Sequence, residues 1–332
     1  MPLPEKQLIR RIRLLTRRLK SAGRSGLGIP HAPSRPQSSP IRKGIDDDCA
    51  VLRIPPGHEA LVTTDFSLEG THFRRQWHPP ESVGHRCLAR GLSDIAAMGG
   101  EPLAIFLSLA LPPGLPQSWV DKFFTGLLAL AGEFVANLAG GDIAESPNGV
   151  LADITLVGSA PRGTAILRSG AKPGDKVYVT GSLGGSASVL SRLLSGAAKK
   201  IRPRDHPAHF FPTPRIAVGR YLRTKKLASA MIDVSDGLST DLHHICEESR
   251  VGARIHADRV PRAEQVSLDL ALNGGEDYEL LFTAPQSKQV PRRIAGVPIT
   301  NIGETTSGRK IVLVKDGSRT VLPARGWEHF KH

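Results

Sequence analysis

Carboxylate side chains occur in tight groups along this sequence, and several of them directly follow a run of apolar residues. Asp65 follows Ala60–Thr64, and Asp233 follows Ala230–Ile232. Acids at strand ends line one edge of a sheet, where their mutual repulsion is costly unless a cation neutralises it. Hard oxygen ligands select Mg²⁺ or Ca²⁺, so the pattern predicts a magnesium site that also engages substrate phosphates. The groups are Asp46–Asp48, Asp65, Asp94, Asp142 after two glycines, Asp233 with Asp236, and Glu276–Asp277 after two more glycines.

Each acidic group also has an ordinary structural interpretation. Asp236 can cap the helix that follows it, and Asp94 can lie on an exposed helical face. Structural roles for all of these groups at once are a weaker explanation than a shared cation. The segment Ser182–Ser186 lies between a strand and a helix, as a phosphate-binding loop does, but it lacks the Walker lysine and the Rossmann glycine spacing.

Three further residue types can do chemistry, and each has a simpler role to set against it. His72 comes just after Asp65 and can contact a substrate phosphate, although a lone histidine is usually structural or solvated. Trp327, near the chain end, is more often a packing anchor in such a position. Cys49 adjoins the acidic run, whose negative charge disfavours a thiolate and makes the residue a poor nucleophile.

Alternating strand and helix patterns must position these side chains. The expected strands are Glu59–Asp65, Leu103–Leu111, Val150–Gly158, Lys176–Gly181, Ala230–Val234, Glu279–Thr283 and Ile311–Val314. The expected helices are Glu81–Met98, Gln117–Asn137, Gly185–Leu194 and Ser239–Ser249. The Gly- and Pro-rich stretch 161–174 divides the strands and helices into two series, which predicts an N-terminal domain over 44–160 and a C-terminal domain over 161–332.

Residues 1–43 form a separate basic arm in this interpretation. Leu8, Ile12, Leu15 and Leu19 recur at helical spacing, so residues 5–20 are expected to form an amphipathic helix whose apolar stripe docks on the body. A Ser-, Pro- and Gly-rich linker follows. The arm carries 11 Lys or Arg and one acid, out of a formal charge of +13 for the whole chain. Without interleaved aromatic residues, this pattern favours a solvated arm over nucleic-acid binding.

Composition bounds the remaining possibilities. A chain of 332 residues with 40% hydrophobic content can bury a substantial core. Its apolar runs are shorter than the roughly 18 residues that a membrane span needs. Three widely spaced cysteines, Cys49, Cys87 and Cys246, form neither a disulfide framework nor a zinc pattern, which indicates a reducing, cytoplasmic setting.

The motifs, read in order, resemble those of thiamine-monophosphate kinases over residues 44–330. In the first half they are GIDDDCAVL (44–52), TTD (63–65), EGTHF (69–73) and LSDIAAMG (92–99). In the second half they are GGD (140–142), RSGAKPGD (168–175), IDVSDGL (232–238), GGEDYEL (274–280) and GWEHF (326–330). Any one of these motifs is weak evidence, but the ordered set is specific.

This resemblance implies an aminoimidazole-ribonucleotide synthetase-like fold of class α/β (α+β). It comprises an N-terminal ATP- and Mg²⁺-binding domain, whose sheet forms a homodimer, and a C-terminal α/β domain. ATP is implied as co-substrate in a cleft shared by the two domains, with thiamine monophosphate as acceptor and thiamine diphosphate as product. The implied ligands of several Mg²⁺ ions are Asp48, Thr63, Thr64, Asp65, Asp94, Asp142, Asp233 and Asp236.

The same resemblance assigns the remaining site residues. Gly141, Asp142, Arg168 and Ser235 are implied to bind ATP, and His72, Glu276 and Trp327 to bind thiamine monophosphate. The residues implied to carry the catalysis are Asp48, Asp65, Asp94, Asp142 and Arg168. Transfer is expected to be direct and in line, because the acceptor phosphate is already anionic and needs no base. The chain departs from the family pattern at Asp46, Gly91 and Ile143.

Two alternatives stay open at this point. One is a related ATP-dependent enzyme such as selenophosphate synthetase, which carries a reactive cysteine with a nearby lysine; Cys49 lacks that context. The other is a degenerate kinase body whose basic arm binds polyanions, for which salt-sensitive nucleic-acid affinity without ATP turnover is the diagnostic observation.

Overall fold

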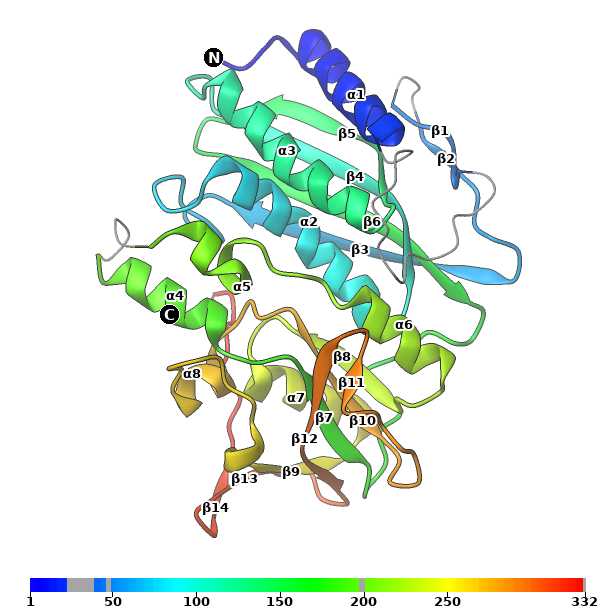
Figure 1. Ribbon diagram of the computed structural model, residues 1–332, viewed down its shortest axis with the longest axis vertical. Coiled ribbons are helices and arrows are strands. Elements are labelled where there is room, and N and C mark those ends of the chain that lie inside the picture. The colour runs from blue at the N-terminus through cyan, green and yellow to red at the C-terminus, as the bar shows by residue number, and fades with distance from the viewer. Residues whose placement is uncertain (23–38, 46–48, 197–200, 331–332) are drawn as a thin grey trace. The chain divides into compact units, whose positions relative to one another are not determined.

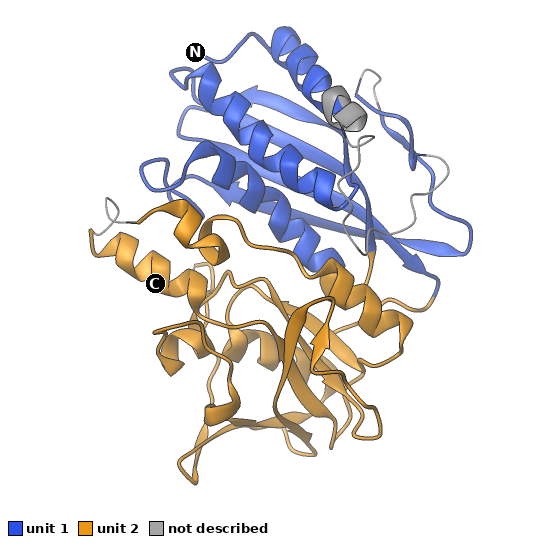
Figure 2. Ribbon diagram, viewed as in Figure 1, with its two compact units in different colours: residues 1–95, 101–162 blue, residues 96–100, 163–332 orange. Residues whose placement is uncertain are grey.

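The computed structural model describes residues 1–22, 39–45, 49–196 and 201–330, and it has the mixed α/β content that the sequence predicts. The chain divides into two compact units (Figure 2). Unit 1 comprises Met1–Ile95 and Glu101–Arg162, and unit 2 comprises Ala96–Gly100 and Gly163–His332. None of the helices in the described part of the chain has the length and apolar character needed to cross a bilayer.

Unit 1 is built on a four-stranded sheet with the order β3–β6–β4–β5. Its strands are β3 (His58–Leu68), β4 (Glu101–Leu111), β5 (Asn137–Glu145) and β6 (Leu151–Pro161). Strand β6 pairs antiparallel with β3 and β4, whereas β5 runs parallel to β4. A separate two-stranded ribbon joins β1 (Ile41–Lys43) and β2 (Val51–Leu52).

Helices α2 (Pro80–Ala97) and α3 (Gln117–Glu133) lie side by side on one face of this sheet (Figure 1). Strand β4 alternates accordingly, with Ile105 and Leu107 buried beneath the helices. The two helices approach closely at two glycines. A Cβ on Gly84 would lie 1.9 Å from the carbonyl oxygen of Phe123, and one on Gly126 would lie 1.8 Å from that of Glu81.

Helix α1 (Glu5–Ala22) confirms the expectation that an amphipathic N-terminal helix docks on the body. Leu8 and Ile12 are buried, and α1 lies against α3. Arg11 adds an ion pair, donating from Nη2 to Oδ2 of Asp121 at 2.7 Å. The arm therefore begins with a packed helix, because its apolar stripe has a surface to cover.

Unit 2 contains a second, larger sheet with the order β14–β13–β9–β12–β7–β10–β8. Its strands are β7 (Lys176–Thr180), β8 (Ala230–Val234), β9 (Gly252–His256), β10 (Glu279–Ala284), β12 (Val297–Thr306), β13 (Ile311–Lys315) and β14 (Ser318–Val321), with β11 (Arg293–Ile294) paired to β12. Its helices are α4 (Gly185–Leu194), α5 (Pro207–Phe210), α6 (Ile216–Thr224), α7 (Leu238–Ser249) and α8 (Leu268–Asn273). Apolar residues of α7 and of the central strands, such as Leu242, Val179 and Leu281, share one buried core.

The expected elements are present, with two clear errors of length. The strand expected to end at Asp65 continues to Leu68. The helix expected over Gln117–Asn137 ends at Glu133, and β5 begins at Asn137. Val135 adopts a φ of 55°, a left-handed conformation that a helix cannot continue through. The N–H of Ala136 then bonds to the carbonyl of Ala131, which closes the helix end and turns the chain into β5.

Candidate functional site

The first group of predicted site residues lies in unit 1, between β3 and α2. Thr63 and Asp65 are two residues apart on β3, so their side chains point to the same face of the sheet, toward α2. The hydroxyl of Thr63 donates a hydrogen bond to the carboxylate of Asp94. Arg90, one helical turn before Asp94, places its Nε 3.7 Å from Oδ1 of Asp65. Thr63, Asp65 and Asp94 are therefore brought together, as the sequence predicts.

Burial gives this group an unusual charge balance. Burial raises the pKa of Asp65 to about 6, and the negative charge of Asp94 adds to the effect while Arg90 opposes it. Asp153 on β6 also disfavours ionisation of Asp65. A bound cation would reduce both the repulsion between these carboxylates and the cost of burying their negative charge. Hard carboxylate and hydroxyl oxygens are the donors that Mg²⁺ accepts, so the donor set fits this ion.

Thr64 and Asp142 belong to the opposite face of the same sheet. The hydroxyl of Thr64 donates to Oδ1 of Asp153 at 2.8 Å. Asp142 pairs with Ser108, which pairs with Asp153, and residues directly opposite in a sheet share a face. Asp153 was missed by the sequence reasoning, although an acid among the apolar residues of the expected strand 150–158 was a usable signal. The roles of Thr64 and Asp142 as metal ligands stay predictions.

Gly141 is required by the backbone next to Asp142. Its φ is 149°, and a Cβ there would lie 1.8 Å from the carbonyl oxygen of Leu107. Strand β5 therefore lies very close to β4 at Gly141, the residue before the exposed Asp142. The N–H of Ile143 donates to Oδ1 of Asp142 at 2.9 Å, which orients that carboxylate. Asp48, predicted as a further ligand, lies outside the described residues.

The second group lies in unit 2, where β8 ends and α7 begins. Asp233 is buried on β8, and Ser235 and Asp236 follow the strand. The N–H of Glu276 donates to the carbonyl of Ser235 at 2.7 Å, and the N–H of Trp327 donates to that of Asp236 at 2.9 Å. The segments that contain Asp236, Glu276 and Trp327 are far apart in the sequence and meet here. They carry residues predicted to bind ATP, the metal and thiamine monophosphate. The Trp327 side chain is 55% exposed, which contradicts a packing role and leaves its ring accessible.

Two residues on α7 join this group without having been predicted. Ligand atoms of Asp236, Asp241 and His244 all lie within 4.8 Å of one another. Burial, followed by the charges of Asp233 and Asp236, raises the pKa of Asp241 well above its ordinary range. The sequence signal was the spacing of Asp241 and His244, three residues apart on one helical face just after Asp236. These side chains could hold a cation together with Asp236.

Arg168 does not join the second group in the described contacts. The carbonyl of its neighbour Leu167 accepts from the N–H of Met231, near the start of β8, whereas Ser235 follows the end of that strand. The hydroxyl of Ser249, the last residue of α7, donates to the Arg168 carbonyl at 3.0 Å. The Arg168 side chain is exposed. Its role in ATP binding stays a prediction.

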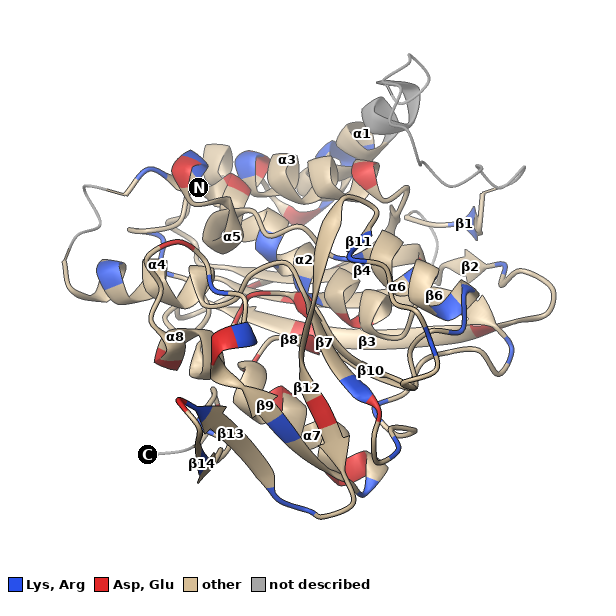
Figure 3. Cartoon of the chain, turned by 60° about the horizontal axis from the view of Figure 1, so that its bottom comes forward, with Lys and Arg blue, Asp and Glu red and all other residues tan. Residues whose placement is uncertain are grey.

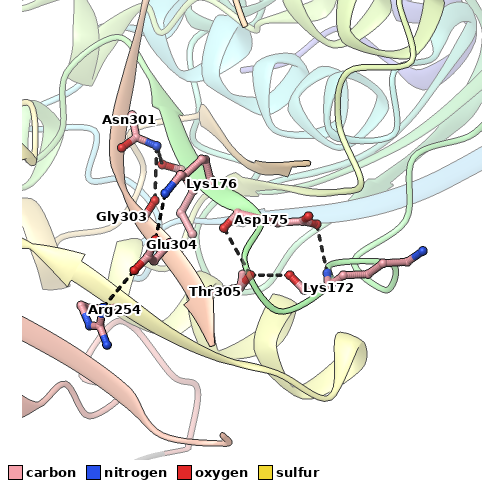
Figure 4. A network of polar contacts seen from close by, with 9 residues as sticks. Lys172, Asp175, Lys176, Arg254, Asn301, Gly303, Glu304 and Thr305 are labelled. Carbon is pink, nitrogen blue, oxygen red and sulfur yellow. Dashed lines mark hydrogen bonds and ion pairs between the residues drawn. The ribbon is translucent and has the colours of Figure 1, made fainter. Parts of the chain in front are cut away.

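Other residues of the 168–175 motif stabilise the fold (Figure 4). The N–H of Lys172 donates to Oδ2 of Asp175 at 3.0 Å, and the hydroxyl of Thr305 on β12 bonds to the Lys172 carbonyl. Next to them, Lys176 donates to Glu304 at 2.8 Å. This part of the motif therefore anchors the start of β7 to β12. Acidic and basic residues are otherwise distributed over many elements of both units (Figure 3).

His72 lies in unit 1, in the loop between β3 and α2, and its side chain is half-buried. Backbone hydrogen bonds curl this loop, with the N–H of His72 donating to the carbonyl of Leu68 at 2.9 Å. The loop follows Asp65 by only a few residues. Contact of His72 with a substrate stays a prediction.

Comparison with known proteins agrees with this arrangement. Residues 46–160 match the model of the AIR synthase related protein N-terminal domain, and residues 172–316 match that of the C-terminal domain. The thiamine-monophosphate kinase of Salmonella typhimurium is 38% identical over 306 residues, covering 87% of this chain and 92% of that protein. That of Bacillus subtilis is 35% identical over 315 residues, covering 88% and 95%.

Solved structures give the same result. The crystal structure of thiamine-monophosphate kinase from Stenotrophomonas maltophilia superposes with a TM-score of 0.78 at 33% identity, covering 96% of this chain and 98% of that one. A structure described as AaThiL complexed with AMPPCP and TMP superposes with a TM-score of 0.74 at 33% identity, covering 83% and 88%. The chain belongs to the thiamine-monophosphate kinases, within the AIR synthase related protein family.

Proposed function

We propose that this protein transfers the γ-phosphoryl group of ATP to thiamine monophosphate, giving thiamine diphosphate and ADP. The observation that carries the proposal is the convergence of Asp236, Glu276 and Trp327 at the end of β8, joined by the hydrogen bonds from Glu276 to Ser235 and from Trp327 to Asp236. The carboxylates there suit a cation that would bind the substrate phosphate, and the exposed ring of Trp327 suits an aromatic substrate. Family membership supports the same reaction.

Magnesium is the metal that these residues fit. Asp65 and Asp94 with Thr63 would hold an ion in unit 1, and Asp233 and Asp236 would hold an ion in unit 2, in each case through oxygen atoms. Bound Mg²⁺ would neutralise phosphate charge during the transfer. Asp241 and His244 are available as additional ligands beside Asp236. Asp48, Thr64 and Asp142 complete the proposed ligand set, and Gly141, Ser235 and Arg168 are proposed contacts of ATP.

The proposed transfer is a single in-line displacement. The attacking phosphate oxygen is already largely anionic near neutral pH, so no protein base has to remove a proton. A covalent route would need an accessible activated nucleophile. Burial raises the pKa of Cys87 and of Cys246 to about 12, so both remain thiols. Ser186 does contact His209 at 2.9 Å, but both side chains are buried.

A homodimer and a cytoplasmic setting complete the proposal. On β3, Val62 and Phe66 are 67% and 55% exposed, on the face opposite Asp65. Exposed apolar side chains on the sheet face opposite α2 and α3 suit burial against a second copy of that sheet. All three cysteines are free, as a reducing compartment requires.

The direct test mixes purified protein with ATP, Mg²⁺ and thiamine monophosphate and separates the products by chromatography. Thiamine diphosphate that appears in proportion to ADP supports the proposal. Omission of Mg²⁺ provides the control. ATP consumption without formation of thiamine diphosphate would overturn the proposal. So would the absence of turnover at every concentration of thiamine monophosphate.

A further inference from the structure

The loop that leaves β3 is a compact turn, not an open connection. The N–H of Gly70 donates to the carbonyl of Phe73 at 2.8 Å, and the N–H of His72 donates to that of Leu68 at 2.9 Å. Phe73 is buried and anchors the far side of the turn. His72 is therefore held between two fixed points of the backbone, the end of β3 and the Phe73 anchor.

The imidazole of His72 is fixed by a hydrogen bond of its own. The N–H of Leu68 donates to Nδ1 of His72 at 3.0 Å. A ring nitrogen that accepts from a backbone amide carries no proton, so the neutral ring has its proton on Nε2. This tautomer makes Nε2 a hydrogen-bond donor, as an anionic oxygen of a substrate requires.

Glu69 holds this turn closed with both of its carboxylate oxygens. Oε1 accepts from Nε of Arg75 at 2.6 Å, and Oε2 accepts from the N–H of Val150 at 2.9 Å. The Glu69 N–H in turn donates to the Val150 carbonyl at 3.0 Å. The side chain of Glu69 is only 15% exposed. One carboxylate thus joins the start of the turn to Arg75, which follows the turn, and to Val150, which directly precedes β6.

The backbone around Glu69 is shaped for this contact. Gly149 has a φ of 67°, and a Cβ there would lie 3.0 Å from Oε2 of Glu69. A larger residue at position 149 would be strained and would crowd the carboxylate. The chain therefore leaves room for Glu69 where Val150 donates to it.

We propose that Glu69 is a positioning residue: by clamping Arg75 and Val150 it holds His72 as the Nε2–H tautomer, with that N–H directed to the phosphate of thiamine monophosphate. The inference rests on the proposed function, in which His72 contacts this substrate. It adds a residue that touches neither substrate nor metal and acts through the geometry of His72. A charge-assisted clamp is the appropriate device, because it is stronger than a hydrogen bond between neutral groups.

The test compares Glu69→Gln with Glu81→Gln. Glu81 lies on α2 in the same unit, and its carboxylate is 3.9 Å from Nζ of Lys122, so the control also removes a charged partner but leaves the turn intact. In Glu69→Gln the KM for thiamine monophosphate should rise about tenfold, while the KM for ATP changes little. Glu81→Gln should leave both values unchanged. The variant Arg75→Gln removes the same ion pair from its more exposed partner and should also raise the KM for thiamine monophosphate. Arg75→Lys keeps the positive charge, so its KM should lie between those of Arg75→Gln and the unmodified protein.

Nitrogen-15 NMR of the histidine rings gives the second measurement, with the His72 signals assigned by their loss in His72→Ala. The unmodified protein should show His72 as the Nε2–H tautomer, and Glu69→Gln should show a mixture of tautomers. An unchanged His72 spectrum in both Glu69→Gln and Arg75→Gln would overturn the positioning role. A changed spectrum with an unchanged KM for thiamine monophosphate would instead remove His72 from the substrate site and contradict the proposed contact. If Glu69→Gln does not fold, the same two measurements, the KM for thiamine monophosphate and the His72 spectrum, are made on Arg75→Gln and Arg75→Lys.

Discussion

Oδ2 of Asp277 accepts a hydrogen bond from the N–H of Gly184 at 2.7 Å. Oδ1 of the same carboxylate lies 3.5 Å from the N–H of Ser186, in the first turn of α4. The segment Ser182–Ser186 lies between a strand and a helix, as a phosphate-binding loop does, but lacks the Walker lysine and the Rossmann glycine spacing. Its amides bind a carboxyl group of the protein itself.

This contact predicts a pH dependence of stability. Burial raises the pKa of Asp277 from 3.8 to about 7, so the folded protein binds this proton more tightly than the unfolded chain. The contribution of Asp277 to stability is therefore greatest below about pH 4 and is lost as the pH rises to about 7. Asp277→Asn keeps an acceptor for Gly184 and removes the titration. In urea unfolding at several pH values, the stability of the variant relative to the unmodified protein should rise between pH 5 and pH 7. A difference that stays constant over this pH range would contradict this, and Asp258→Asn, at an exposed position, is the control.

The carboxylates of unit 1 should be essential for turnover and unfavourable for the metal-free fold. Asp65→Asn and Asp94→Asn should each lower kcat by about 100-fold or more, since each removes a hard anionic ligand. Above pH 6 the metal-free Asp65→Asn variant should melt at a higher temperature than the unmodified protein, because an ionised Asp65 is disfavoured by burial and by Asp94. Turnover at limiting Mg²⁺ and melting with EDTA measure the two effects. Full activity would show that these acids are structural.

Removal of residues 1–40 should weaken the fold more than the chemistry. The deletion exposes the surface that Leu8 and Ile12 cover and breaks the ion pair between Arg11 and Asp121. A loss of about 3 kcal/mol in the free energy of unfolding is expected from burial of two such side chains. The kcat should stay within about twofold, because the predicted site residues lie beyond the deletion. A large fall in kcat at an unchanged melting temperature would contradict this expectation.

The single-displacement mechanism predicts inversion at phosphorus. A substrate with a chiral γ-phosphoryl group passes through one in-line step if no phosphoenzyme forms. Stereochemical analysis of the thiamine diphosphate product measures the outcome. Retention of configuration, or labelled protein recovered after incubation with ATP alone, would require a covalent intermediate.

Local patterns predicted most of the fold, and the errors have physical causes. Strand β8 and helix α4 were predicted with the bounds that the structure has, because their apolar patterns are clear and end at polar or glycine residues. Strand β12 was missed since its sequence, VPITNIGETT, contains proline, asparagine and glycine. It forms a strand through tertiary pairing: a Cβ on Gly303 would lie 2.0 Å from the Arg254 carbonyl oxygen, so only glycine permits that approach.

The candidate site shows the same division. Asp65 was expected at the end of its strand, but β3 continues to Leu68, so Asp65 lies within the strand, on the face where Thr63 bonds to Asp94 of α2. Asp236 does follow the end of β8, and backbone hydrogen bonds bring Glu276 and Trp327 to that end. Which face each side chain occupies was not predicted, because the faces of Thr64 and Asp142 depend on the register of their strands. Asp241 resembles an ordinary acid of an exposed helix in the sequence, and only the packing of α7 against β8 buries it next to Asp236.

The position of Thr63 and Thr64 on opposite faces of β3 ties the chemistry of unit 1 to the accuracy of its folding. All 11 residues of β3 pair with β6, from His58 opposite Pro161 to Leu68 opposite Leu151. A slip of one residue would exchange the faces, bringing Val62 and Phe66 under α2 and turning Asp65 outward. Such a chain would keep every side chain named in the site and lose the site itself. Insertions or deletions within β3 should therefore be far more damaging to this enzyme than most single substitutions along the same strand.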